Sequence, residues 1–163
     1  MSQKTGFKNL ALSPWKLNWF FLKKMPLGFI AGMRVESFDD KHATVSVPYN
    51  YITKNPFKSV YFAVQSMAAE LSSGVIAINE VMNARMPVSM LVFNMDAQFT
   101  KKAKSKTVFT CNDGTAIKKA VKKAIETGEG QTVTVTSTGT DSEGDVVSVF
   151  HFTWTFKAKS LKK

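Results

Sequence analysis

The sequence predicts an α+β fold in which one antiparallel β-sheet wraps around a long central α-helix. Three observations lead to this prediction: a slim apolar helix from about residue 60 to 83, alternating apolar and polar residues on both sides of it, and turn-forming residues between those segments. A helix that is apolar nearly all round is a buried one. Covering it with antiparallel strands is the economical arrangement.

The N-terminal extension, residues 1–27, is predicted to contain one short helix. Ser13 followed by Pro14 is a favourable helix start, and the apolar face that follows comprises Trp15, Leu17, Phe20, Phe21 and Met25. We expect this helix to lie across the core or a neighbouring subunit rather than on a membrane surface, because interfacial helices usually have a more strongly basic polar face. The apolar run is also too interrupted to predict a membrane span or a signal peptide.

The core, residues 28–157, begins with a predicted hairpin in which MRVESF and ATVSVP flank the turn DDKH. Ser59 is a candidate N-cap for the central helix, which is slim because its interior contains many Ala, Ser and Gly residues. The segments 89–103 and 106–112 read as two strands that pair across a lysine-rich turn.

An inserted amphipathic helix follows within residues 113–130, with Ile117, Val121 and Ile125 on its apolar face and lysines opposite. A terminal hairpin of segments 131–139 and 145–157 completes the sheet, and residues 158–163 form a basic tail. Because 163 residues suffice for one ordinary domain and not for two, we expect a single domain over residues 1–163.

The composition argues against three functional classes: nucleic-acid binding, metal binding and catalysis by a thiol. The net charge of +10 invites a nucleic-acid interpretation, but the lysine runs lack interleaved aromatic residues, so we expect no nucleic-acid partner and mostly solvated lysine faces. His42 and His151 are too few and too scattered for a metal site. The lone Cys111 can form no internal disulfide and has no nearby His to activate it, which favours a cytoplasmic protein without a catalytic thiol.

The segment NPFKSVYFAVQSMAAELSSG, residues 55–74, places a carboxylate, Glu70, in the otherwise apolar helix. Asn55, Tyr61, Glu70 and Gly74 have a spacing that resembles the hot-dog fold thioesterase superfamily, in particular the phenylacetyl-CoA thioesterase-like branch and an uncharacterised thioesterase-like family within it. In that group an Asn precedes a His-Gly-Gly turn by six residues, an Asp or Glu lies nine beyond the His, and a small residue follows four later. The element order from about residue 28 to 157 also matches.

The resemblance implies an acyl-CoA thioesterase, with coenzyme A as part of the substrate, no separate cofactor, and sites shared between the subunits of a homodimer or a dimer of dimers. Glu70 would be the general base or nucleophile, and Asn55 would orient water or the carbonyl. Backbone N–H groups near Phe62 and Ala63, at the start of the central helix, would polarise the thioester. Further substrate-binding candidates are Tyr61, Gln65, Ser66 and Ser73, and Lys101, Lys102 and Lys104 are candidates for the CoA phosphates.

Two departures from the family pattern leave alternatives open. The lysine-rich helix near residues 115–126 replaces what is usually a shorter connection between strands. Tyr61-Phe62-Ala63 stands where the family has His-Gly-Gly, and glycine lets a backbone approach a ligand more closely than Phe or Ala does. The second interpretation is therefore a non-catalytic acyl-CoA or fatty-acyl binding protein, in which Glu70 is structural, bonded to the nearby serines or paired with Arg85 or a lysine at a subunit interface. A third is a polyanion-binding protein that uses the lysine faces.

Overall fold

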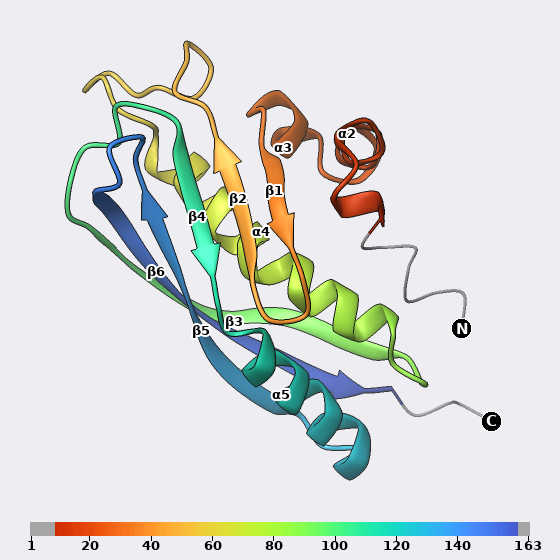
Figure 1. Cartoon of the computed structure of the whole chain (residues 1–163). Coiled ribbons are helices and arrows are strands. Elements are labelled where there is room, and N and C mark those ends of the chain that lie inside the picture. Colours follow the sequence, from red (N-terminus) through yellow and green to blue (C-terminus); the bar gives the residue numbers. More distant parts are fainter. Residues whose placement is uncertain (1–8, 160–163) are drawn as a thin grey trace.

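The computed structural model describes residues 9–159, and six strands within this range form one antiparallel sheet in the order β1-β2-β4-β5-β6-β3 (Figure 1). Residues 1–8 and most of the predicted basic tail lie outside the described range. In chain order the elements are α2 (Pro14–Lys24), α3 (Pro26–Ile30), β1 (Arg34–Phe38), β2 (Ala43–Val47), α4 (Phe62–Met82), β3 (Val88–Phe99), β4 (Thr107–Cys111), α5 (Gly114–Thr127), β5 (Gln131–Thr140) and β6 (Val146–Ala158).

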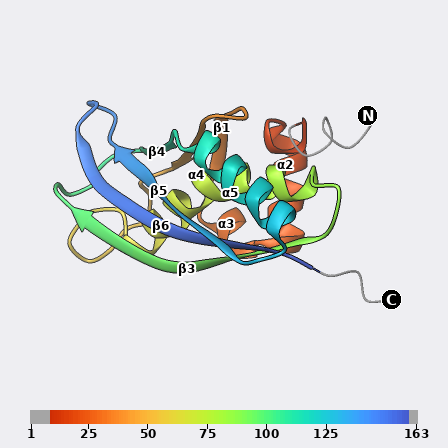
Figure 2. The same ribbon diagram turned by 90° about the horizontal axis from the view of Figure 1, so that it is seen from below.

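The sheet curves around α4, as the view from below shows (Figure 2). The helix fits there because its sides are small: Ala68, Ala69, Ser72 and Ala77 are buried against the strands. The last strand contributes an aromatic face to the core, since Phe150, Phe152, Trp154 and Phe156 of β6 are all buried. The predicted α+β arrangement of a sheet around a central helix is therefore confirmed.

Helix α5 covers the end of the sheet beside α4. Its N-terminus approaches the β1–β2 turn closely: Gly114 donates its backbone N–H to the Lys41 carbonyl at 2.9 Å, and a Cβ at this position would lie 2.5 Å from the Asp40 carbonyl oxygen. Only a glycine allows this contact without a shift of the turn. The helix, predicted within residues 113–130, is capped at its C-terminal end by Gly128, whose φ of 70° lies in the left-handed region.

The predicted pairing of the two middle strands was wrong. Strand β3 pairs with β6 over its whole length, from Val88 opposite Ala158 to Phe99 opposite Ser148, whereas β4 pairs with β2 and β5. The lysine-rich segment 100–106 is thus a crossover and not a hairpin turn. Alternation of apolar and polar residues identifies a strand but does not identify its neighbour. In the sheet, β3 pairs only with β6 and forms one edge.

Two predictions at helix starts and faces also need correction. Helix α4 begins at Phe62, with Tyr61 rather than Ser59 as its N-cap, because Ser59 is bonded to Asn55 in the preceding loop. In α2 the Pro14 start is confirmed, but Trp15 is 77% exposed, and only Leu17 and Phe21 of its expected apolar face are fully buried. None of the helices within residues 9–159 combines the length and hydropathy that crossing a bilayer requires.

Candidate functional site

A cavity of about 620 Å³ opens at the N-terminal end of α4. The loop before the helix forms one wall, and the end of β3 with the start of the crossover forms the other. Six of the residues predicted as site residues line it: Asn55, Tyr61, Phe62, Gln65, Lys101 and Lys102. The remaining predicted residues, Ala63, Ser66, Glu70, Ser73 and Lys104, are not part of its lining.

The Asn55 side chain shapes the loop that forms the first wall. Its Oδ1 accepts hydrogen bonds from the backbone N–H groups of Phe57 (2.9 Å) and Ser59 (3.2 Å), and its Nδ2 donates to the Ser59 Oγ at 3.1 Å. These bonds hold the turn in which Lys58 has a positive φ of 59°. Asn55 therefore lies at the cavity, and its amide is largely committed to the protein's own backbone.

The first turn of α4 presents backbone donors toward this region. Tyr61 N–H donates to the Thr53 carbonyl, and Val64 and Gln65 donate to the Tyr61 carbonyl. No residue in the described range accepts a hydrogen bond from the backbone N–H of Phe62 or Ala63, which have no intrahelical acceptor at this end of the helix. These N–H groups and the positive end of the helix dipole can bind a developing negative charge.

Aromatic side chains form the apolar wall of the cavity. The Phe62 ring contacts the Tyr61 and Phe99 rings, with centroid distances of 4.8 and 6.5 Å, and Phe99 contacts the buried Phe150. Phe57 also lines the wall and is largely exposed. Sequence reasoning missed Phe57 and Phe99; an aromatic residue after Pro56 in a polar turn was the available signal for Phe57, and nothing in the sequence marked the end of β3 as a neighbour of α4.

Gln65 is a packed amide beneath the cavity. Its Nε2 donates to the Val60 carbonyl at 3.0 Å, and its Oε1 accepts from the Ser148 Oγ at 2.8 Å, so that it ties the loop, α4 and β6 together. The side chain is almost fully buried. Its role in this structure is to fix the position of the helix start.

Glu70 lies two turns further along α4 and is partly buried. Among residues 9–159, its carboxylate has no hydrogen-bond or ion-pair partner, and burial raises its pKa to about 7. The helix makes room for it at Gly74, where a Cβ would lie 3.2 Å from the Glu70 Oε1. A carboxylate with this pKa exchanges a proton readily near neutral pH, which is the property a general base requires.

The neighbouring serines do not satisfy this carboxylate. Ser66 Oγ donates to the Phe62 carbonyl at 2.9 Å, and Ser73 Oγ donates to the Glu70 backbone carbonyl at 3.1 Å while it accepts from the Trp154 Nε1 at 3.0 Å. Arg85, the other expected structural partner, lies beyond the C-terminal end of α4 and lines a different cavity. Within residues 9–159 these serines and Arg85 therefore do not pair with the Glu70 carboxylate, and a pairing across a subunit interface stays a prediction.

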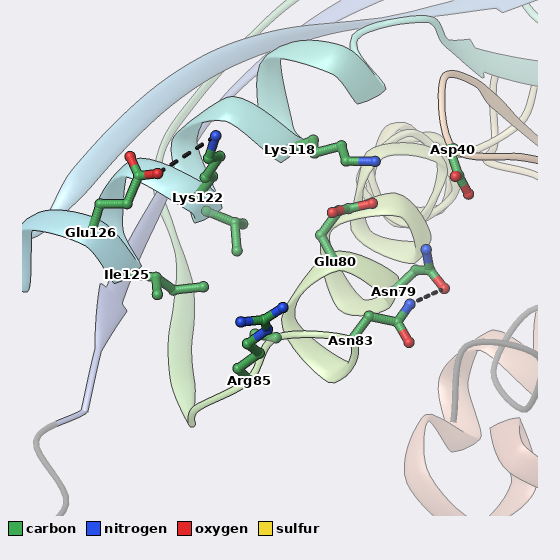
Figure 3. A pocket seen from close by; sticks show the side chains of 11 residues that line it. Asp40, Asn79, Glu80, Asn83, Arg85, Lys118, Lys122, Ile125 and Glu126 are labelled. Carbon is green, nitrogen blue, oxygen red and sulfur yellow. Dashed lines mark hydrogen bonds and ion pairs between the residues drawn. The ribbon is translucent and has the colours of Figure 1, made fainter. Parts of the chain in front are cut away.

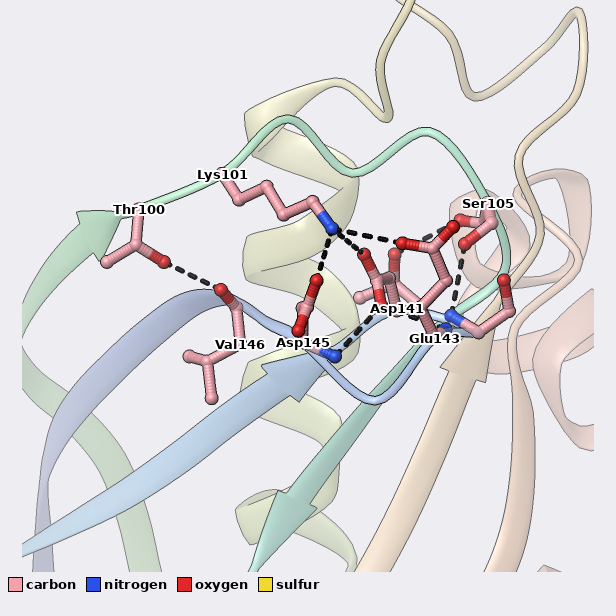
Figure 4. Close-up of polar contacts among 9 residues, drawn as sticks. Thr100, Lys101, Ser105, Asp141, Glu143, Asp145 and Val146 are labelled. Carbon is pink, nitrogen blue, oxygen red and sulfur yellow. Dashed lines mark hydrogen bonds and ion pairs between the residues drawn. The ribbon is translucent and has the colours of Figure 1, made fainter.

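Lys101 is held by three carboxylates of the β5–β6 turn (Figure 4). Its Nζ lies 3.0 Å from Asp141 Oδ2, 3.3 Å from Glu143 Oε2 and 2.5 Å from Asp145 Oδ2. The hydrogen bonds with Asp145 and Asp141 raise the pKa of Lys101, and the lysine in turn lowers the pKa of Asp141. The acidic oxygens lie within 4.8 Å of one another, but the ammonium group already supplies the cation that such a cluster would attract.

The other predicted phosphate ligands are less constrained. Lys102 lines the cavity and is exposed, and Lys104 is exposed but lies outside the lining. Neither has an ion-pair partner among the residues that the structure describes. Lys106, at the end of the same run, pairs with Glu36 at 2.6 Å.

A second cavity, of about 700 Å³, lies at the opposite end of α4, between α5 and the β1–β2 turn (Figure 3). It contains none of the predicted site residues. Its charged lining is mixed: Arg85, Lys118 and Lys122 face Asp40, Glu80 and Glu126, and Lys122 pairs with Glu126 at 3.5 Å. Cys111 contributes to neither cavity, and burial raises the pKa of its thiol to about 11, so that it is a poor nucleophile at neutral pH.

Comparison with known structures supports the fold. A structure from Pseudomonas aeruginosa described as a "Probable Thioesterase" matches with a TM-score of 0.74 and 18% identity, over 90% of this chain and 97% of that one. A Haemophilus influenzae thioesterase matches with a TM-score of 0.65 and 13% identity, over 92% and 95% of the two chains. A variant of another P. aeruginosa thioesterase matches with a TM-score of 0.67 and 17% identity, over 90% and 95%.

At these identities the matches establish the fold alone, which is the predicted hot-dog fold. No curated protein matches the sequence significantly. Residues 13–156 match the family described as "Domain of unknown function (DUF4442)". Because this match spans most of the chain, the protein belongs to the DUF4442 family, on a hot-dog fold.

Proposed function

We propose that this protein is a thioesterase that hydrolyses acyl-CoA to the free acid and CoA. The observation that carries the proposal is Glu70, a partly buried carboxylate with no described partner, whose pKa burial raises to about 7. A charge of this kind is costly to bury, and such groups gather at functional sites. The related structures described as thioesterases support the same reaction class.

In the proposed reaction Glu70 accepts a proton from a water molecule, and the water oxygen attacks the thioester carbonyl carbon. The carbonyl oxygen becomes negative and is stabilised by the backbone N–H groups of Phe62 and Ala63. The C–S bond then breaks, and the CoA thiolate takes the proton from Glu70. The products are a carboxylic acid and a free thiol, and Glu70 returns to its starting state.

The geometry of one chain favours a site shared between two subunits. Glu70 lies eight residues beyond Phe62 on α4, which is about 12 Å along the helix axis at 1.5 Å per residue. A base and an oxyanion donor acting on one carbonyl group must each lie within about 3 Å of its reacting atoms. We therefore propose that the N–H groups of one subunit act together with the partner subunit's Glu70.

Strand β3 is the surface we propose for the dimer. It is an edge strand of 12 residues, and its outer face exposes Leu91 (64%) and Phe93 (72%). Long, apolar, unpaired edges are uncommon in isolated subunits because they promote pairing with another strand. Antiparallel pairing of two β3 strands would continue the sheet and set the two α4 helices side by side in opposite directions.

For the CoA phosphates we propose Lys102 as the principal contact, with Lys104 beside it. Lys101 is a poorer candidate, because the three carboxylates around it would repel a phosphate. Lysine acts on phosphate as a point charge and needs no exact geometry. The aromatic wall of Phe57, Phe62 and Phe99 suits an apolar acyl or pantetheine segment at the same mouth.

The direct test is thiol release from a panel of short, long and aromatic acyl-CoA thioesters by the unchanged protein and by Glu70→Gln. We expect turnover in the former and a loss of about 10²–10⁴-fold in kcat in the latter, the usual contribution of a general base. Ser66→Ala, on the same helix with its hydroxyl bonded to the backbone, is the matched control and should retain most of the activity. Equal turnover by both Glu70 forms would contradict the proposal.

A non-catalytic acyl-CoA binding protein is the second candidate. It is favoured by the Phe62 side chain, which packs on Phe99 at the helix start where the resembled family has glycine. This alternative predicts saturable acyl-CoA binding by isothermal titration calorimetry, without thiol release by any form. Polyanion binding is less supported, since Lys101, Lys106 and Lys122 are all engaged in ion pairs within the chain.

A further inference from the structure

The two N-terminal helices and the turn before them expose many large apolar side chains. They comprise Leu12, Trp15, Trp19, Leu22, Leu27, Phe29 and Ile30, and we call them together the N-terminal apolar surface. Trp15 is 77% exposed, Leu27 66% and Trp19 54%. Leu12, Trp15, Trp19 and Leu22 recur at spacings of three and four residues, which places them on one side of α2 and the turn before it.

This surface is distinct from the face that packs on the core. Leu17 and Phe21, on the inner side of α2, are buried. The helices α2 and α3 lie beside β1, at the edge of the sheet opposite β3 (Figure 1). The dimer proposed through β3 therefore forms at the other edge of the sheet. When a helix is apolar on two sides, one side packs on its own domain, and the other is a candidate surface for binding a partner or a membrane.

The charged residues around the N-terminal apolar surface indicate which kind of partner it binds. Residues 1–35 contain six Lys or Arg residues and no Asp or Glu. Within α2, Lys16, Lys23 and Lys24 accompany the exposed tryptophans, and the Lys23 Nζ lies 4.6 Å from the centre of the Trp19 ring. Exposed tryptophans flanked by lysines, without acidic residues, are typical of helices that lie in the interface of an anionic membrane.

We propose that the N-terminal apolar surface binds the surface of a membrane that contains anionic lipids. Trp15, Trp19 and Leu22 enter the boundary between headgroups and acyl chains, while Lys16, Lys23 and Lys24 contact lipid phosphates. A second copy of this chain is a poorer occupant, because a symmetric contact would set these lysines against their own copies with no acidic residue of α2 between them. The expectation from sequence, that this helix lies across the core or a neighbouring subunit, is confirmed for its inner side, where Leu17 and Phe21 are buried; the proposal concerns its outer side.

The test is co-sedimentation of the full chain with phosphatidylcholine vesicles, with and without phosphatidylglycerol. We expect binding to the anionic vesicles only, weakened by salt. Trp15→Ser with Trp19→Ser should reduce the partition coefficient by at least about tenfold. Lys16→Gln with Lys24→Gln should reduce it by about fivefold per lysine, and the matched pair Lys119→Gln with Lys123→Gln on α5 should have little effect.

Tryptophan fluorescence gives a second measurement that does not depend on sedimentation. Trp154 is buried in the core, so a blue shift on adding anionic vesicles reports on Trp15 and Trp19. The shift should vanish in the double serine variant while its circular dichroism stays unchanged. Absence of binding to anionic vesicles, equal loss in the two lysine pairs, or dissociation of an oligomer by the serine substitutions without any vesicle binding would each overturn the proposal.

Discussion

The two ends of α4 carry cavities of similar size and opposite character. The N-terminal cavity, about 620 Å³, has an aromatic wall, unpaired backbone donors, and Lys101 and Lys102 as its charged lining. The C-terminal cavity, about 700 Å³, has three basic and three acidic side chains. In the first cavity Lys101 is paired with three carboxylates of the β5–β6 turn, and Lys102 has no ion-pair partner in the described range; in the second, acidic and basic side chains share the lining itself. The two volumes do not distinguish the cavities, whereas the unpaired backbone N–H groups of Phe62 and Ala63 occur at the N-terminal one.

The first prediction tests the N-terminal site by removing a single backbone N–H group, that of Phe62. Phe62→Pro removes the N–H at the first position of α4, where proline is tolerated and the preceding Tyr61 already has an extended ψ of 137°. We expect kcat for thioester hydrolysis to fall by about 10²–10³-fold, the effect of losing an oxyanion donor. Steady-state thiol release measures it.

Phe62→Ala is the matched control, because it removes the same ring and keeps the N–H. Its kcat should fall by less than about tenfold. If the alanine and proline variants lose the same activity, the ring and not the backbone donor is what matters, and the helix N-terminus is not the oxyanion site.

The second prediction asks whether the acid and the donors come from different subunits. Glu70→Gln and Phe62→Pro chains, each nearly inactive alone, are denatured, mixed and refolded together. Half of the random dimers are then mixed, and each contains one intact shared site, so that we expect about a quarter of the wild-type rate. Refolding each variant alone is the control. Recovery no greater than the average of the two parents would show that each site belongs to one subunit.

The third prediction concerns the cost of Glu70 to the fold. Its folded pKa of about 7 lies above its ordinary value of 4.5, so the folded state binds the proton more tightly than the unfolded state. The stability linked to this group is complete below about pH 4.5 and is lost as the pH rises through 7, by up to about 3 kcal/mol. Glu70→Gln should remove this part of the pH dependence and stabilise the protein at pH 8, as urea unfolding would measure.

Glu36 provides a control of opposite sign. The hydrogen bonds from Lys106 and Ser46 lower its pKa, so its contribution to stability is present above its unfolded pKa and is lost as the pH falls. Glu36→Gln should therefore destabilise the protein at neutral pH. A Glu70→Gln protein with an unchanged stability profile between pH 4.5 and 8 would mean that the buried carboxylate finds a partner in the assembled protein.

Much of the fold was predictable because its signals are local. The lysine face of α5, the alternation in β6 and the small residues of α4 each follow from a few consecutive side chains. The partner of β3 was not predictable in this way. Alternation in segment 89–103 is equally compatible with pairing to its nearest neighbour in sequence and to β6, and only the assembled sheet decides between them.

In the candidate site, too, local signals were predictable from the sequence and contacts between distant segments were not. Glu70 stood out because a carboxylate in an apolar helix is unusual on sequence alone, and the structure leaves it without a described partner. The fate of Lys101 depends on Asp141 and Asp145, some 40 residues away in a turn of another hairpin. Asn55 was singled out correctly as a residue of this region, but its commitment to the backbone of Phe57 and Ser59 is a property of the folded loop.

The last prediction uses the lysines to compare the two ends of α4 directly. Lys102→Met should raise KM for acyl-CoA by about fivefold to tenfold, since a phosphate contact contributes about 1 kcal/mol or somewhat more, with kcat little changed. Lys118→Met, which removes the same charge from the C-terminal cavity, should leave KM unchanged. A pantetheine thioester, which lacks the nucleotide phosphates, should not distinguish the Lys102 variant from the unchanged protein. Equal KM increases in both variants would reduce the role of Lys102 to general attraction by a basic protein, and the contrast between the two cavities would then rest on the aromatic wall and the unpaired N–H groups at the start of α4.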